Sequence, residues 1–285
     1  MTYRELYEYG VSKLEAANIA EAKLDARLLL EYICHTDRNA LLVHGDSERS
    51  SMEEQFYQMV IEKRATHIPL QHITGEQEFM GLTFRVNEHT LIPRQDTELL
   101  VEEAMRYLNS GMRILDMCTG SGCILLSLLK YSTCCEGIGV DISAKALEVA
   151  RENATRLGFE CGRQVNFVES DLFAKLDCEY KFDVVVSNPP YIETAVIDTL
   201  MPEVKDYEPL SALDGMEDGL FFYEKIVDKV PEYMRDGGWL FFEIGYNQGE
   251  AVKNMMLQKG FQDVKVLQDY AGLDRVVLGR KKVAF

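Results

Sequence analysis

The stretch RILDMCTGSGCILLSLLK, residues 113–130, decides the fold. It opens with a short apolar run that is typical of a buried strand, and the leucine-rich half from Cys123 onward has the pattern of a helix. Cys118-Thr119-Gly120-Ser121-Gly122 joins the two. Glycines at such a loop let the backbone turn tightly and approach a ligand with no Cβ in the way. We therefore expect a nucleotide-like ligand here, with a plain tight turn as the alternative.

The same alternation of strand and helix continues to the C-terminus. It predicts a doubly wound, mostly parallel sheet with helices on both faces, a Rossmann-like α/β fold. Such sheets bind ligands outside the carboxyl ends of their strands, where the strand order reverses. Strands are expected at 113–118, 136–141, 164–170, 182–187 and 238–245 and near Val264 and Val276, with helices at 123–130, 143–158, 220–230 and 249–258.

The chain before Arg113 is organised differently. Residues 1–70 have the pattern of a small helical bundle, opened by a capping box from Thr2 to Glu5. Residues 71–92 are expected to be a linker that contains a β-hairpin, and 93–285 the ligand-binding domain. Within this last part, Asp96 is placed to cap a helix. No catalytic pattern appears in the bundle.

Composition narrows the class of protein. The 285 residues include 47 Asp and Glu against 30 Lys and Arg, a formal net charge of -17, which disfavours direct binding to nucleic acid. The N-terminus lacks the pattern of a secretory signal, and no apolar stretch reaches the roughly 18 residues of a membrane span. Seven scattered cysteines suggest reduced thiols rather than a disulfide framework, and no metal-binding spacing appears. We expect a cytoplasmic protein, a monomer, with no membrane and no metal.

Two further strand ends point to the ligand. Asp141 follows Asp116 by 25 positions, close to the offset of about 20 at which an acidic side chain reaches ribose hydroxyls. Capping the next helix is its alternative role. The dinucleotide fingerprint is incomplete, since its last glycine would fall at Leu125, and no phosphate loop follows. An adenosine derivative without phosphates fits better, and S-adenosylmethionine is one; its product would be S-adenosylhomocysteine. Asp171 is placed to accept a hydrogen bond from the adenine amino group and Leu172 to pack on the ring, with a turn as the alternative role of Asp171.

The fourth strand ends in Asn188-Pro189-Pro190-Tyr191. Two prolines end a strand because neither has a backbone donor, but that does not explain the amide and the phenol. The Asn188 side-chain oxygen and the Pro189 carbonyl can each accept one hydrogen of a planar NH2 group, which orients the nitrogen lone pair toward a methyl donor. Tyr191 offers a flat face to cover that group. We expect Asn188, Pro189 and Tyr191 to be catalytic, with Pro190 also contacting the substrate, mainly through positioning.

At these residues the chain resembles the class I S-adenosylmethionine-dependent methyltransferases that carry this tetrapeptide, and more narrowly the release-factor glutamine methyltransferases. The likeness extends over nearly the whole chain, including the helical N-terminal part and the hairpin. Its most discriminating segment is Leu91-Ile92-Pro93-Arg94-Gln95-Asp96-Thr97-Glu98, and it also includes the stretch from Glu208-Pro209 to Asp218-Gly219-Leu220. Two departures stand out: Gln95 where the family usually has Pro, and Cys118 where it usually has Gly.

The resemblance implies a seven-stranded sheet and methylation of the glutamine side-chain amide in the Gly-Gly-Gln motif of class I peptide chain release factors. It implies that Asn188 to Tyr191 hold the glutamine and that the helical part helps to dock the release factor. The implied contacts with S-adenosylmethionine are Cys118, Thr119, Gly120, Ser121, Gly122, Asp141, Leu172 and Asn188, to which the argument above adds Asp171.

Three alternatives remain open at this point. The acceptor is a ribosomal-protein glutamine, or it is an exocyclic amino group of a nucleic acid base, or the chain is a donor-binding scaffold that catalyses nothing. Glu243, at the end of the fifth strand, lies near the expected cleft, but ordinary exposure at a strand end explains it equally well.

Overall fold

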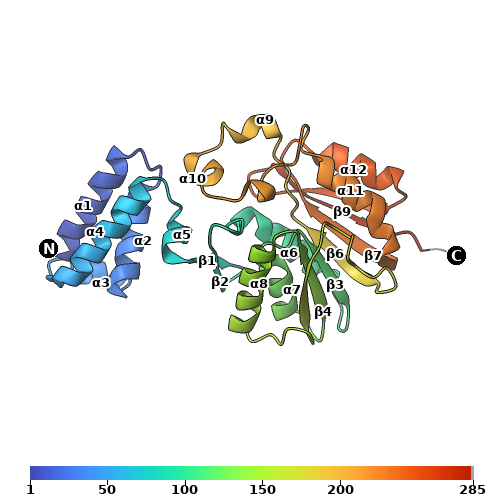
Figure 1. Cartoon of the computed structure of the whole chain (residues 1–285), viewed down its shortest axis with the longest axis horizontal. Helices are drawn as coiled ribbons and strands as arrows, with labels where there is room; N and C mark the ends of the chain where they lie inside the picture. Colours follow the sequence, from blue (N-terminus) through green and yellow to red (C-terminus); the bar gives the residue numbers. More distant parts are fainter. Residues whose placement is uncertain (284–285) are drawn as a thin grey trace. The chain divides into compact units, whose positions relative to one another are not determined.

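The computed structural model describes residues 1–283 and divides the chain into two compact units (Figure 1). The helical unit comprises Met1–Glu76 together with Met201–Tyr207. The sheet unit comprises Gln77–Leu200 and the chain from Glu208 onward. Each unit has a hydrophobic core of its own.

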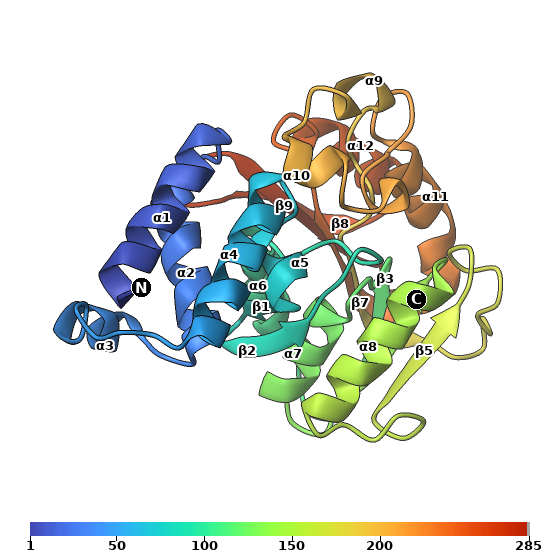
Figure 2. The same cartoon turned by 60° about the vertical axis from the view of Figure 1, so that its left-hand side comes forward.

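Three helices of the helical unit, α1, α2 and α4, lie side by side around a hydrophobic core (Figure 2). The predicted capping box at Thr2 and Glu5 is confirmed, and Ser50 and Glu53 form a second one. Gly10 is required where α1 approaches α4, since a Cβ there would lie 2.0 Å from the Tyr57 hydroxyl. The helices of this unit are α1 (Tyr3–Ala16), α2 (Ala22–Cys34), α3 (Arg38–Val43), α4 (Ser51–Ala65), α5 (Leu70–Thr74) and α10 (Pro202–Lys205).

A buried ion pair ties α10 to this bundle. The Arg64 guanidinium lies 2.8 Å from the Asp25 carboxylate and 3.0 Å from that of Glu203. Burial raises the pKa of Asp25, although the bond from Arg64 opposes the shift. Because removing one partner would leave a buried charge uncompensated, the pair constrains where residues 201–207 fold.

Helix α4 has a second apolar face that the bundle does not cover. Tyr57 and Ile61 are fully buried, whereas Met52, Phe56 and Met59 on the opposite side are 65%, 48% and 49% exposed. Residues four and seven positions apart share one face of a helix, so these three side chains form a continuous stripe.

The sheet unit is built on a seven-stranded sheet with the order β5-β4-β3-β6-β7-β9-β8. The predicted mostly parallel α/β fold is confirmed: only β9 runs antiparallel to its neighbours. The chain proceeds from β3 outward in one direction and then returns to the other side of β3 with β6, so the strand order reverses between these two strands. The strands are β3 (Arg113–Met117), β4 (Glu136–Asp141), β5 (Val165–Glu169), β6 (Phe182–Ser187), β7 (Met234–Glu243), β8 (Gln262–Gln268) and β9 (Asp274–Arg280).

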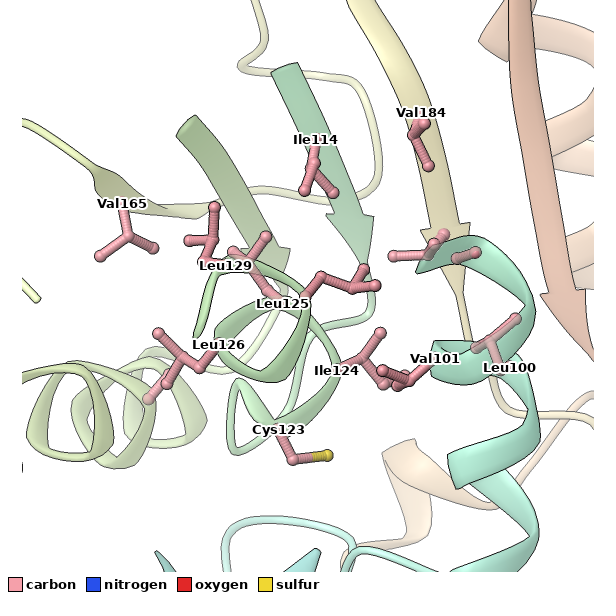
Figure 3. Close-up of a cluster of buried hydrophobic side chains, with 14 of the residues drawn as sticks. Leu100, Val101, Ile114, Cys123, Ile124, Leu125, Leu126, Leu129, Val165 and Val184 are labelled. Atoms are coloured by element: carbon pink, nitrogen blue, oxygen red, sulfur yellow. The ribbon is translucent and has the colours of Figure 1, made fainter. Parts of the chain in front are cut away.

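Successive residues of the central strands point to opposite faces of the sheet, where two sets of helices cover them. In Figure 3, Leu125 and Leu129 of α7 lie near Ile114 of β3, while Val101 comes from α6. On the other face, Leu115 packs with side chains of α11 and α12. The helices of this unit are α6 (Glu98–Met105), α7 (Cys123–Tyr131), α8 (Ala144–Arg156), α9 (Thr194–Ile197), α11 (Phe221–Lys229) and α12 (Gly249–Gln258), with 3-10 turns η1 (Gln95–Thr97), η2 (Leu210–Ala212) and η3 (Val230–Glu232).

The predicted hairpin is present as β1 (Glu76–Phe79) and β2 (Leu82–Arg85). Asn153 of α8 fixes it to the sheet unit, since its amide oxygen accepts from the Arg85 N–H at 2.7 Å and its amide nitrogen donates to the Arg85 carbonyl at 3.1 Å. The same nitrogen also donates to the Ser121 carbonyl at 2.9 Å. This bond links the hairpin to the loop from Cys118 to Gly122, called the glycine loop below.

The predicted cap at Asp96 is wrong. Asp96 lies inside η1, and α6 begins after Thr97 without a side-chain cap. The Asp96 carboxylate instead lies 3.2 Å from the Arg275 guanidinium. The 3-10 turn moves the N-cap position one residue on, from Asp96 to Thr97.

Within residues 1–283, no helix is both long and apolar enough to cross a membrane.

Candidate active site

A cavity of about 430 Å³ opens at the carboxyl ends of β3, β4 and β6, at the point where the strand order reverses. Its wall is mostly apolar, with a few polar groups from the strand ends. The predicted residues that line it are Cys118, Thr119, Gly120, Ser121, Asp141, Asp171, Leu172, Asn188 and Pro190.

The glycine loop after β3 is held by bonds to its immediate neighbours. The Thr119 hydroxyl donates to the buried Asp116 carboxylate at 2.6 Å, and the Gly122 N–H donates to the Thr119 carbonyl at 2.8 Å. Burial raises the pKa of Asp116 to about 7. Gly139 on β4 makes room for this arrangement, since a Cβ there would lie 2.9 Å from the Thr119 hydroxyl. The loop is therefore shaped before any ligand arrives.

Cys118 occupies a position that suits glycine. Its φ of 64° lies in the left-handed region, which costs a residue with a Cβ roughly 1 kcal/mol. This conformation accounts for the glycine that the family usually has here. Burial raises the pKa of the Cys118 thiol, so it lines the cavity as a neutral group.

Asp141 holds the glycine loop in place from the next strand. One carboxylate oxygen accepts from the Gly120 N–H at 2.8 Å and the other from the Ser143 N–H at 2.9 Å. Burial raises its pKa, against the effect of these two bonds. Ser143 caps α8 by itself, as its hydroxyl accepts from the Ala146 N–H. Each Asp141 oxygen keeps a lone pair that can accept from a ligand hydroxyl.

Asp171 and Leu172 follow β5 and reach the same cavity. Leu172 has a φ of 45°, a strained conformation for a branched side chain, and it packs at the edge of the core on the α11 side. Strain of this kind persists only where the surroundings fix the backbone. It places an apolar side chain and a carboxylate next to each other at the cavity wall.

Asn188 follows β6 and lines the cavity on the other side of the glycine loop. Its amide nitrogen donates to the Thr97 hydroxyl at 3.4 Å. Its amide oxygen accepts no hydrogen bond from residues 1–283. The Asn188 amide oxygen can therefore accept from a ligand, while the amide nitrogen is already bonded to Thr97.

The rest of the tetrapeptide has a different placement. Pro189 is buried, and its carbonyl accepts no hydrogen bond from the part of the chain that the structure describes. Tyr191 does not line the cavity, because its ring packs against the core and its hydroxyl donates to Glu243 at 3.3 Å. Gly122 does not line it either, since it approaches Ala150 and Leu126.

Residues distant in sequence clamp the backbone of Tyr191. The Gln248 amide nitrogen donates to the Tyr191 carbonyl at 3.0 Å. Gly215 and Gly219 lie against the same backbone: a Cβ would come within 2.7 Å of the Tyr191 Cα at Gly215 and 2.3 Å of its carbonyl oxygen at Gly219. Ile192 then bonds to the segment beside Asp214 as an isolated parallel bridge. These contacts fix the direction in which the tetrapeptide leaves the sheet.

Glu243 is buried, so the interpretation of ordinary strand-end exposure is wrong. It is 2% exposed and ends β7 beside the tetrapeptide. Burial raises the pKa of its carboxyl to about 7, while the Thr97 hydroxyl and the Arg275 guanidinium lower it. Its second oxygen, Oε2, has no hydrogen-bond partner among the described residues.

Glu208 is another buried carboxylate, and it is bonded to a residue of the cavity wall. Glu208 accepts from the Arg94 guanidinium at 2.5 Å, and Arg94 lines the cavity. Burial raises the pKa of Glu208, against the charge of Arg94. The pair joins the segment before η1 to the loop before η2.

Sequence reasoning identified the strand-end residues of the cavity and missed the residues that support them. Arg94, Thr97, Glu208 and Gly219 lie in the two segments that carried the family resemblance, but nothing local to those segments indicated their contacts. The same holds for Gly215, which lies in the second of these segments, and Gln248 had no signal in the sequence. Their roles depend on packing between segments far apart in the chain.

Comparisons with known proteins agree with this architecture. Residues 5–75 match the PrmC N-terminal domain, and residues 108–268 match a methyltransferase domain. Among curated proteins, the release factor glutamine methyltransferase of Geobacter sulfurreducens is 42% identical over 98% of this chain and 96% of its own length. That of Clostridium botulinum is 38% identical over 99% and 100%. Among solved structures, a methyltransferase from Pyrococcus furiosus has a TM-score of 0.53 at 17% identity over 72% of this chain and 91% of that one, which supports the fold alone.

Proposed function

This chain belongs to the family of release factor glutamine methyltransferases, and on that premise we propose what its cavity binds and how it acts. The enzyme transfers the methyl group of S-adenosylmethionine to the side-chain amide nitrogen of a glutamine in a peptide chain release factor, that of the Gly-Gly-Gln motif. The observation that carries the proposal is the placement of Asn188. Its free amide oxygen lines the same cavity as the glycine loop and Asp141.

The donor end of the cavity fits an adenosine with an amino acid tail. Cys118 to Ser121 line the cavity, where their backbone would lie against the ligand, and the Asp141 carboxylate is placed to accept from ribose hydroxyls. Leu172 gives an apolar surface for the adenine ring, and Asp171 an acceptor for its amino group. When bound, S-adenosylmethionine supplies a methyl group on a positively charged sulfur, a good leaving group.

The acceptor end orients a nitrogen of low reactivity. An amide nitrogen is planar and its lone pair is delocalised, so it reacts only when held in line with the methyl carbon. Asn188 and the Pro189 carbonyl each accept one N–H of the glutamine, which fixes the direction of the lone pair. The new N–C bond would form at the expense of the donor's C–S bond, and the alkylated nitrogen, cationic at first, would lose a proton to solvent. Orientation of this kind contributes up to roughly 7 to 11 kcal/mol to lowering a barrier.

Positioning accounts for the rate without a charged base at the reacting nitrogen. Glu243, the buried carboxyl bonded to the Tyr191 hydroxyl, does not line the cavity. Tyr191 therefore acts, in this proposal, indirectly: its ring packs against the core, its hydroxyl bonds to Glu243, and it exchanges no proton with the substrate amide.

We propose that the helical unit helps to bind the release factor. Its contribution is the exposed stripe of Met52, Phe56 and Met59 on α4, an apolar surface that the unit itself leaves uncovered. Replacing Phe56 by Asp is expected to raise KM for the release factor and leave the affinity for S-adenosylmethionine unchanged. Replacing the buried Tyr57 would test folding instead, so Glu62→Ala on the same helix is the matched surface control.

The proposal is tested by mass spectrometry of a release factor incubated with the enzyme and S-adenosylmethionine. One added methyl group on the peptide that contains Gly-Gly-Gln is the expected result, absent when the enzyme is omitted. Methyl label in RNA, DNA or a ribosomal protein, and none in the release factor, would assign a different acceptor. Donor binding without transfer to any of them would mean that the chain is a scaffold.

A further inference from the structure

Asn153 of α8 is a buried amide to which the proposed mechanism gives no role. It is 1% exposed, and its hydrogen bonds join two segments that are far apart in the sequence. Its oxygen accepts from the Arg85 N–H at 2.7 Å, and its nitrogen donates to the carbonyls of Arg85 at 3.1 Å and Ser121 at 2.9 Å. Because a backbone N–H only donates and a carbonyl only accepts, these partners leave the amide a single orientation.

The face of α8 that carries Asn153 follows the glycine loop. Ala146, Ala150 and Asn153 share this face, because side chains four and seven positions apart lie above one another on a helix. Ala146 lines the cavity, and a Cβ at Gly122 would lie 3.3 Å from that of Ala150. The small side chains let the helix approach the loop, so that Asn153 reaches the carbonyl of Ser121, a residue of the cavity wall.

The other partner of Asn153 lies at the end of β2, which leads into a different part of the cavity wall. After Arg85 the chain is buried at Val86 and then reaches the cavity. We call residues 89–94 the wall segment; those of its residues that line the cavity are His89, Thr90, Leu91, Pro93 and Arg94. One amide therefore joins the glycine loop to the strand from which the wall segment continues.

Neither partner needs Asn153 for its own shape. Asp141 already holds the glycine loop by accepting from the Gly120 N–H at 2.8 Å. The hairpin is held at its turn as well, since the Tyr131 hydroxyl donates to the Met80 carbonyl at 2.6 Å. What Asn153 adds is the connection between the loop and the hairpin.

We propose that Asn153 is a positioning residue that couples the donor end of the cavity to the hairpin. A ligand that fixes the glycine loop also fixes the Ser121 carbonyl and, through Asn153, the end of β2. Such coupling is reciprocal: if breaking the link weakens donor binding by some factor, donor binding stabilises the linked hairpin by the same factor. The inference rests on the proposed function, because it takes S-adenosylmethionine as the ligand. Asn153 itself does not line the cavity, so it acts only through the segments that it joins.

The first test uses the wild-type chain. Hydrogen–deuterium exchange measured by mass spectrometry compares the peptide of residues 79–86 with and without saturating S-adenosylhomocysteine. No residue of β1 or β2 lines the cavity, so direct contact with the ligand does not account for slower exchange there. We expect exchange of this peptide to slow by about fivefold or more, the lower end of the usual range for coupled sites. Unchanged exchange at full occupancy would overturn the coupling.

The second test compares Asn153→Ser with Tyr131→Phe. A serine side chain is too short to reach both Arg85 and Ser121, so the link is broken. We expect KM for the donor, and Kd for S-adenosylhomocysteine by calorimetry, to rise by about fivefold or more, with kcat at saturating donor nearly intact. The slowing of hairpin exchange by the ligand should also disappear, an effect that damage to the glycine loop alone would not produce.

Tyr131→Phe is the matched control. It removes a hydrogen bond to the hairpin that does not involve the glycine loop, so donor affinity should stay at the level of the wild type. Thermal unfolding checks that both variants are folded at the temperature of the assay. If Asn153→Ser does not fold, the exchange measurement on the wild type decides.

The outcomes separate the inference from the function on which it rests. A wild-type protein that binds no S-adenosylhomocysteine, or that leaves the release factor unmethylated, would overturn the proposed function. A wild-type protein that does both, together with an Asn153→Ser variant of equal donor affinity, would overturn the coupling alone. An equal loss of affinity in Tyr131→Phe would also overturn it, because the effect would then follow the stability of the hairpin and not the link to Ser121.

Discussion

The two ends of the cavity are stabilised in different ways. At the donor end, Asp116 bonds to Thr119 three residues away, and Asp141 bonds to Gly120 across one strand–helix unit. At the acceptor end, the tetrapeptide depends on residues 91, 52 and 57 positions away, namely Thr97, Glu243 and Gln248. The donor site is therefore a local property of successive loops, whereas the acceptor site depends on the assembled sheet unit.

This difference separates affinity from turnover. Changes around the acceptor end should reduce methyl transfer and leave donor binding nearly intact, even when the changed residue is distant in sequence. Changes at the donor end should weaken donor binding and leave methyl transfer at saturating donor nearly intact. The predictions below test that separation, from the largest expected effect to the smallest.

Asn188→Ala removes the acceptor that orients the substrate nitrogen. We expect turnover to fall by roughly 10²- to 10³-fold, the usual cost of losing one preorganised polar contact in an active site. The affinity for S-adenosylmethionine, measured by calorimetry, should change only a few-fold. A rate near that of the wild type would remove Asn188 from the mechanism.

Gly219→Ala should disturb the tetrapeptide from outside the cavity. The new Cβ would lie 2.3 Å from the Tyr191 carbonyl oxygen, and φ is 70°. We expect a loss of roughly 3 kcal/mol in the free energy of unfolding, from backbone strain and overpacking together, and a lower turnover. Gly111→Ala is the matched control, because φ there is 80° and the Cβ would meet nothing within 4 Å. Equal losses in urea unfolding for the two variants would show that strain alone matters.

The ionisation of Glu243 should appear in the pH dependence of stability. Its pKa is raised to about 7 in the folded protein, so the neutral form is favoured there. The stability that the neutral carboxyl contributes is present at low pH. It is lost as the pH rises from the ordinary pKa of a glutamate through 7. Between pH 5 and pH 8, the free energy of unfolding of the wild type should fall by roughly 2 to 3 kcal/mol relative to that of Glu243→Gln. A constant difference would mean that Glu243 ionises as it does in the unfolded chain.

Asp141→Asn should weaken the donor end alone. One carboxylate oxygen is replaced by an N–H donor that faces ribose hydroxyls or the Gly120 N–H. We expect affinity for S-adenosylmethionine to fall by about tenfold, or 1.4 kcal/mol, with turnover at saturating donor largely kept. If turnover fell while affinity stayed the same, the two ends of the cavity would not be separable.

The sequence predicted the parts of this architecture that are encoded locally. The strands, the glycine loop and the strand-end residues Asp141 and Asn188 followed from apolar runs and turn residues within short windows. The cap at Asp96 failed because a 3-10 turn shifted the helix start. The burial of Glu243 and the contacts of Gly219 were not predictable, since both depend on how segments separated by dozens of residues pack together.

Cys118 shows the same limit at a single residue. Its identity as a departure from the family pattern was readable from the sequence. The reason for that pattern, a backbone in the left-handed region beside the cavity, appears only in the structure.

The central claim is that two oxygens hold the glutamine nitrogen in line with the methyl group. A crystal structure of the enzyme with S-adenosylhomocysteine and a peptide containing Gly-Gly-Gln tests it most directly. The account predicts the glutamine amide nitrogen at hydrogen-bonding distance from both the Asn188 side-chain oxygen and the Pro189 carbonyl, with the Asn188 amide nitrogen on Thr97. A glutamine held elsewhere, or an Asn188 oxygen turned toward Thr97, would contradict it.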